Sequence, residues 1–175
     1  MIRTEDAIAA ARALIGTPYA ELDCINLIKK ILRTAPGGDP RYTTAGTDEL
    51  WSSAQKSAKY RHLAWRQEGL DGVGAGWLVF KGRGTDARDG EPHHVGIATG
   101  EGTVIHSSSR AGVTETMLTA ADGWTLAAKH RDIEAREPEA KDVRLYAVTV
   151  PCPDEATAQA VLRALHGAYL TGGDD

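Results

Sequence analysis

The sequence lacks the features that mark several classes of protein. No apolar run approaches the roughly 18 residues that a membrane-spanning helix needs. No block of lysine or arginine stands out, so a nucleic-acid partner is not expected. The first six residues, MIRTED, turn acidic at once and contain no apolar signal core, so we expect no signal peptide in this chain.

Cysteine is scarce, with only Cys24 and Cys152. One disulfide between them would be a weak framework for 175 residues, and no C-x-x-C pair of a structural zinc site exists. A free cysteine in a chain with six histidines is a candidate nucleophile. The alternative is that Cys24 is a small buried hydrophobic residue.

What the chain does contain is typical of one globular domain. It has 175 residues, of which 42% are hydrophobic and 25% are charged, with a net charge of −4. That length can bury a sizeable core without disulfides or metals. The 19 glycines and the low aromatic content of 6% indicate a loop-rich protein.

The spacing of apolar residues changes along the chain from helical to strand-like. Helical stripes predict helices over residues 5–15, from Asp23 to about Pro36, over 48–59 with Thr47 as cap, and over 155–169. Strand-like patterns predict strands over 77–80, 94–99, 103–107 and 143–150, and 61–75 is ambiguous. Helices before strands predict an α+β domain over 1–150, in which the helices pack on a central antiparallel sheet. We expect the C-terminal helix and tail, 151–175, to pack on the same domain.

Cys24 lies where its predicted helix begins. Backbone N–H groups and the positive end of the helix dipole favour a thiolate at such a position, and we therefore expect a lowered thiol pKa. The same N–H groups can hold an oxyanion. Cys24 is also in phase with Leu27 and Ile28, so position alone does not separate a nucleophile from a core residue.

A predicted hairpin supplies the stronger argument. If residues 100–102 form a three-residue loop, Gly96 faces His106, and His94 lies on the same face of the sheet. His94 and His106 are then diagonal neighbours, which suits a base and a second residue that orients it. A two-residue loop would place His106 on the opposite face.

The remaining histidines are interpreted as surface or core residues. His62, His130 and His166 fall in this group, and His93 should point away from His94. A metal site made of Cys24, His94 and His106 is the less favoured alternative, because a structural zinc site usually has four ligands with short paired spacings. We expect no metal and no cofactor.

Four short segments resemble the NlpC-type cell-wall cysteine peptidases, a papain-like family. They are IGTPY (15–19), LDC (22–24), HVGIATG (94–100) and VIHSS (104–108). The order and the intervals of these segments are also similar to those of the family. The resemblance implies a papain-like fold with Cys24 as nucleophile, His94 as base and His106 as the orienting residue. It further implies that Tyr19 and Asp23 bind substrate, with Asp23 at the free amino end of the peptide.

The implied reaction is hydrolysis of a peptidoglycan stem peptide between D-glutamate and a diamino acid. The chain departs from the family in having Ile25-Asn26 where Ser-Gly is usual, in a shorter turn from Tyr19 to Cys24, and in Gly76-Trp77 before a strand. The alternatives are a thiol amidase or acyl transferase on the same fold, and a non-catalytic cell-wall binder.

The expected location follows from the missing signal. The chain should be cytoplasmic as synthesised, and a phage or prophage origin would let it reach the cell wall on a phage tail or through a lysis pore. The sequence leaves open the oligomeric state, the exact scissile bond and the role of Cys152.

Overall fold

The computed structural model describes residues 1–57, 60–82 and 92–136. The chain divides into two units, 1–141 and 142–175, and every described residue belongs to the first. The predicted strand 143–150 and helix 155–169, and with them the expected packing of 151–175, lie outside the described residues. None of the helices in the described ranges is long and apolar enough to cross a membrane.

Three α-helices and two 3₁₀ turns lie in this part of the chain. They are α1 (Thr4–Arg12), α2 (Cys24–Thr34), α3 (Thr47–Ser52), η1 (Ser53–Gln55) and η2 (Ala120–Asp122). Helix α2 buries the stripe that the sequence predicted, including Leu27, Ile28, Ile31 and Leu32. Each such side chain contributes roughly 1.5–3 kcal/mol when it leaves water, so packing rather than intrinsic propensity stabilises the helix.

Six antiparallel strands form the main sheet, in the order β2-β7-β3-β4-β5-β6. They are β2 (Leu63–Glu68), β3 (Leu78–Lys81), β4 (His94–Ala98), β5 (Thr103–Ser108), β6 (Gly112–Met117) and β7 (Trp124–His130). A separate parallel pair joins β1 (Ile2–Arg3) to β8 (Ile133–Glu134). The α+β class and the central antiparallel sheet are therefore confirmed.

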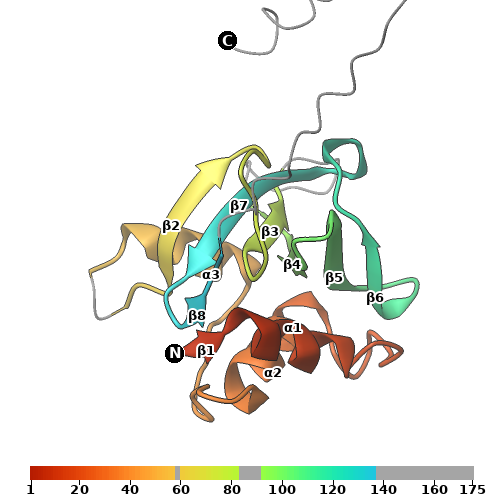
Figure 1. Ribbon diagram of the computed structural model, residues 1–175, viewed down its shortest axis with the longest axis horizontal. Coiled ribbons are helices and arrows are strands. Elements are labelled where there is room, and N and C mark those ends of the chain that lie inside the picture. The colour runs from red at the N-terminus through yellow and green to blue at the C-terminus, as the bar shows by residue number, and fades with distance from the viewer. Residues whose placement is uncertain (58–59, 83–91, 137–175) are drawn as a thin grey trace, which may run out of the picture. The chain divides into compact units, whose positions relative to one another are not determined.

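The sheet carries an apolar cluster on each face. Helices α1 and α2 lie together on one side of it, and α2 packs on β4 and β5 (Figure 1). Leu78 and Phe80 of β3 point into this helix-side cluster, whereas Val79 belongs to a second cluster with Trp77 and Trp124. Because side chains alternate along a strand, the second cluster lies on the face turned away from α2.

Several predicted boundaries were wrong. Helix α1 ends at Arg12 rather than residue 15, and the helix predicted over 48–59 is a six-residue α-helix followed by a 3₁₀ turn. Gly46, not Thr47, occupies the N-cap of α3. Strands β2, β6 and β7 were not predicted.

Candidate active site

Cys24 is the first residue of α2, as predicted. Asp23 has an extended backbone, and its Oδ1 accepts a hydrogen bond from the backbone N–H of Asn26 at 2.8 Å, which caps the helix. The cysteine is free and only 6% exposed, within the helix-side cluster. Cys24 is therefore both a packed core residue and a residue at a helix N-terminus.

The sulfur of Cys24 has three polar neighbours. Oγ1 of Thr47 lies 3.9 Å from Sγ, and the backbone N–H groups of Val95 and Ile25 hydrogen-bond the sulfur. These contacts favour a thiolate, but burial outweighs them and raises the pKa of the thiol above its ordinary value. The expectation of a lowered pKa was therefore wrong, because loss of solvent opposes the charge more strongly than the helix end supports it.

His94 and His106 are paired as the hairpin argument predicted. Gly96 faces His106 across β4 and β5, and Nε2 of His94 lies 2.8 Å from Nδ1 of His106. The two rings are nearly perpendicular, at 87°. A Cβ at Gly96 would stand 2.9 Å from the Ile105 carbonyl oxygen and 3.0 Å from the His106 Cβ, so glycine permits this close packing.

Both rings are neutral at pH 7. Burial lowers the pKa of His94 to about 3, with smaller contributions from His106 and Lys81. Burial also lowers the pKa of His106 to about 4, again with a contribution from Lys81. Among the described residues, no hydrogen bond joins Cys24 to His94, although the neighbouring Val95 contacts the sulfur.

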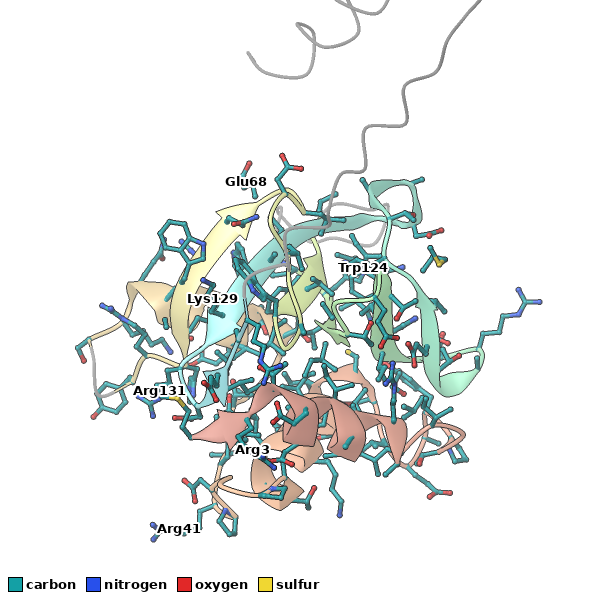
Figure 2. The ribbon with its side chains drawn as sticks, viewed as in Figure 1. Arg3, Arg41, Glu68, Trp124, Lys129 and Arg131 are labelled. Atoms are coloured by element: carbon teal, nitrogen blue, oxygen red, sulfur yellow. The ribbon has the colours of Figure 1, made fainter. Side chains whose placement is uncertain are left out.

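Trp124 and Lys81 form the surroundings of the two rings. The Trp124 ring, labelled in Figure 2, lies 5.4 Å from the ring of His94 and 5.3 Å from that of His106. Nζ of Lys81 lies 4.8 Å from the centroid of the same indole. Trp124 is fully buried and excludes water from this side of the histidines.

Thr116 extends the histidine pair on β6. Its Oγ1 lies 3.2 Å from Nε2 of His106, so both ring nitrogens of His106 have partners. A threonine hydroxyl either donates or accepts, so Thr116 is compatible with either tautomer of His106.

The two predicted substrate-binding residues lie in the segment before α2. Tyr19 is 37% exposed, and its pKa is raised by burial and by the nearby negative charges of Cys24 and Asp23. The phenol is thus both accessible and near enough to Cys24 and Asp23 to feel their charge. The cap uses one carboxylate oxygen of Asp23, and Oδ2 retains acceptor capacity.

This chain is similar to known proteins in its fold. Neither a family model nor a curated protein matches the sequence. The NlpC/p60 domain of the peptidoglycan hydrolase SagA superposes with a TM-score of 0.51 at 22% identity, covering 73% of this chain and 99% of that one. The P60 domain of the M. avium subspecies paratuberculosis antigen MAP1204 gives 0.50 at 18% identity, covering 72% and 93%. The chain has the NlpC/p60 fold. The predicted papain-like resemblance is confirmed as a fold.

Within this NlpC/p60 fold, β5 and β6 hold the segment that leads into Cys24. The Gly16 N–H donates to the Val113 carbonyl and the Val113 N–H donates to the Thr17 carbonyl, both at 2.9 Å. The buried hydroxyl of Ser107 donates to the Leu22 carbonyl at 2.5 Å. The segment that leads into Cys24 is therefore fixed to the strand that carries His106.

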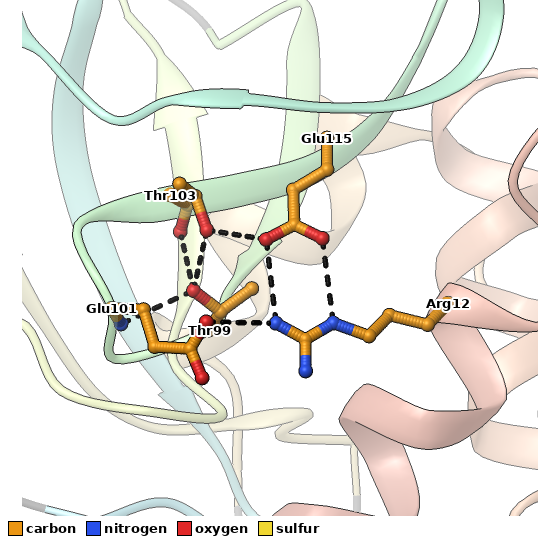
Figure 3. Close-up of polar contacts among 5 residues, drawn as sticks. All are labelled: Arg12, Thr99, Glu101, Thr103 and Glu115. Carbon is orange, nitrogen blue, oxygen red and sulfur yellow. Dashed lines mark hydrogen bonds and ion pairs between the residues drawn. The ribbon is translucent and has the colours of Figure 1, made fainter.

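An exposed polar network fixes the other end of the hairpin (Figure 3). Arg12 of α1 contacts Glu115 at 3.3 Å and Glu101 at 3.0 Å, and Thr103 donates to Glu115 at 2.6 Å. The Thr103 hydrogen bond and Arg12 lower the pKa of Glu115. Exposed ion pairs contribute about 0–1 kcal/mol each, so the network orients the turn more than it stabilises the fold.

The other histidines mostly match their interpretation. His130 is buried, with Nε2 3.1 Å from the Tyr42 hydroxyl, and Nδ1 accepts from the Asp132 N–H at 3.2 Å. His62 packs beside it, but its buried Nδ1 has no hydrogen-bond partner in the described residues. His93 is exposed, and His166 lies outside the described residues.

The metal alternative finds no cluster to support it. Within residues 1–57, 60–82 and 92–136, no group of three His, Cys, Asp or Glu side chains is arranged to hold a metal ion.

Sequence reasoning missed four residues around the site, namely Thr47, Lys81, Thr116 and Trp124. None belongs to a short motif, and each reaches the site through strand pairing or helix packing between distant segments.

Proposed function

We propose that this chain is a cysteine peptidase that hydrolyses peptidoglycan stem peptides. The observation that carries the proposal is the 2.8 Å bond between His94 and His106, on the strand whose next residue, Val95, contacts the Cys24 sulfur. A nucleophile, a base and a residue that orients the base are the three parts of a thiol hydrolase site. The NlpC/p60 domain of a peptidoglycan hydrolase shares the fold, which favours the cell wall as the source of substrate.

The contacts between the two histidines and Thr116 fit either tautomer, and the proposed chemistry selects one. In that tautomer Nε2 of His94 donates to Nδ1 of His106, and Nε2 of His106 donates to the Thr116 hydroxyl. This arrangement leaves the lone pair on Nδ1 of His94. The opposite arrangement would protonate Nδ1, and a protonated nitrogen cannot take the thiol proton.

The proposed reaction starts from a neutral Cys24 thiol and a neutral His94 imidazole. As the peptide carbonyl carbon approaches, the S–H bond of Cys24 breaks, its proton moves to Nδ1 of His94, and the sulfur bonds to the carbon. His94 returns that proton to the leaving amine as the C–N bond breaks. Water, deprotonated by His94, hydrolyses the acyl-enzyme and restores the thiol. Backbone N–H groups at the start of α2 hold the oxyanion.

The proposed substrate is the bond between D-glutamate and a diamino acid. Tyr19 lies beside the nucleophile and is accessible, which suits contact with the substrate. Oδ2 of Asp23 is the acceptor that we assign to the free amino end of the peptide. Ile25 is buried, whereas a serine at this position could contact substrate, so the pocket wall differs from the usual pattern.

Incubation with stem peptides tests the proposal, with products identified by mass spectrometry. The chain should cut after D-glutamate. Cys24→Ala and His94→Ala should abolish cleavage, and the matched variants Cys152→Ala and His93→Ala should retain it. Cleavage that survives Cys24→Ala would refute the assignment.

A second candidate function is acyl transfer, or hydrolysis of another amide, by the same thiol. Only Ile25 favours it, because an isoleucine at this position removes the usual polar contact to a stem peptide. Turnover of acyl thioesters without turnover of stem peptides would select it. No turnover of either, together with a thiol inert to alkylation even at pH 10, would select the non-catalytic binder.

A further inference from the structure

Helix α3 brings a threonine hydroxyl to the Cys24 sulfur. Thr47 is the first residue of α3 and is 7% exposed. Its Oγ1 lies 3.9 Å from Sγ, across 23 residues of sequence, and this is the hydroxyl's only hydrogen bond among the described residues. The Thr47 side chain does not cap its own helix, because the N-cap is Gly46 and no side chain caps the helix. The usual structural use of a threonine at a helix start is therefore absent.

The buried thiol needs such a donor. When its proton leaves, a negative charge forms in a site that is almost closed to water. A buried charge is stable only where donors replace the lost solvent. Backbone N–H groups of Val95 and Ile25 supply two, and the Thr47 hydroxyl is the side-chain donor that completes the set.

We propose that Thr47 belongs to the reacting centre, where its hydroxyl donates to the Cys24 sulfur and stabilises the thiolate. The inference rests on the proposed function in taking Cys24 as the nucleophile. The Cys24 proton passes to Nδ1 of His94, and Thr47 keeps its own proton. Toward the neutral thiol, the Thr47 hydroxyl can either donate or accept a hydrogen bond. When the thiolate forms, the hydroxyl rotates so that it donates to the sulfur.

The test measures the thiol itself, so that it does not depend on knowing the substrate. The full chain carries Cys152→Ala, so that only Cys24 reacts, and the rate of alkylation by iodoacetamide is followed from pH 6 to 11. Thr47→Val removes the hydroxyl at constant shape. It should raise the apparent pKa by about one unit and slow alkylation at neutral pH about tenfold. Thr47→Ser should stay within about twofold of the parent.

Thr44 offers a matched control. It is also a buried threonine, and its hydroxyl has no hydrogen-bond partner in the described residues. Thr44→Val should leave the alkylation profile unchanged. The proposal is overturned if the Thr47→Val profile coincides with that of the parent, or if Thr44→Val shifts it equally. If Thr47→Val does not fold, the same comparison is made between Thr47→Ala and Thr47→Ser.

Cleavage assays separate this inference from the proposed function. A shifted thiol pKa in Thr47→Val, with no stem-peptide cleavage by the parent, would support Thr47 and reject the substrate. Cleavage of stem peptides by the parent, together with an unshifted thiol pKa in Thr47→Val, would support the substrate and reject the role of Thr47.

Discussion

Lowering the pH from 7 to 5 should destabilise this fold through its buried histidines. Burial lowers the pKa of His130 to about 3 and that of His94 to about 3, from an ordinary value of 6.5. His62 and Arg131 further oppose a charge on His130, and Asp132 lies 3.8 Å from its Nδ1. Between pH 6.5 and 3 these histidines are therefore protonated in the unfolded chain but neutral in the folded chain. The free energy of unfolding keeps its full value above pH 6.5 and decreases as the pH falls below 6.5.

The size of the loss follows from the same values. At pH 5 a histidine with a folded pKa of about 3 binds almost no proton, whereas its unfolded form is nearly fully protonated. Each such group removes about 2 kcal/mol between pH 7 and pH 5. Burial lowers the pKa of His106 to about 4, so it contributes about as much as His94, and the three histidines together lose about 6 kcal/mol. A domain of this kind has about 5–15 kcal/mol in all.

Urea unfolding at pH 7 and pH 5, followed by tryptophan fluorescence, measures the difference. His130→Gln should reduce the loss by about 2 kcal/mol, whatever its effect on stability at pH 7. His93→Gln, at an exposed position, should leave the loss unchanged. An equal loss in His130→Gln and the parent, or no loss at all, would refute the reasoning. Glu115 does not confuse the test, because its pKa is lowered from 4.5, outside this pH window.

Three further predictions concern the site and its supports. Thr116→Val should lower kcat/KM about tenfold through the tautomer of His106, with Thr116→Ser restoring it and urea unfolding unchanged within about 0.5 kcal/mol. Gly112→Ala should cost about 2–4 kcal/mol, because a Cβ there would lie 2.3 Å from the Thr17 carbonyl oxygen at φ +68°. Gly102→Ala, at φ +81° with open space around it, should cost only about 1 kcal/mol in the same urea assay. The alkylation rate of Cys24 in the parent should still be rising at pH 9, since burial raises its pKa; a plateau by pH 8 would contradict this.

Local patterns predicted the parts of the site that depend on neighbours in sequence. The α2 stripe and the cap at Asp23 set the start of the helix, and hence the place of Cys24. Residues 100–102 set the register of the hairpin, and hence the pairing of His94 with His106. The predicted start of α2 and the predicted turn at 100–102 therefore placed Cys24, His94 and His106, which are the central residues of the candidate site.

The features that could not be predicted from the sequence depend on contacts between segments that are far apart in the chain. Strand β7 is distorted by a register shift opposite Phe80 and Lys81, which disrupts the alternation that marks a strand. Strand β6 lies at an edge of the sheet, and three of its six residues are polar, consecutively at 114–116, so it shows no alternation of polar and apolar residues. Thr47 and Trp124 reach the site only after these elements have packed, so no local signal identifies them.

Burial explains why the predicted lowering of the Cys24 pKa was wrong, and it also constrains the proposed reaction. It raises the pKa of Cys24 and lowers that of His94, so a preformed thiolate–imidazolium pair is disfavoured on both sides. The proton must then move as the substrate carbonyl arrives, when the negative charge passes at once from sulfur to the oxyanion. A site of this kind keeps its nucleophile neutral until substrate is bound, and every donor around the sulfur acts mainly on the transition state. Removing such a donor, as in Thr47→Val, should therefore lower kcat more than it raises KM.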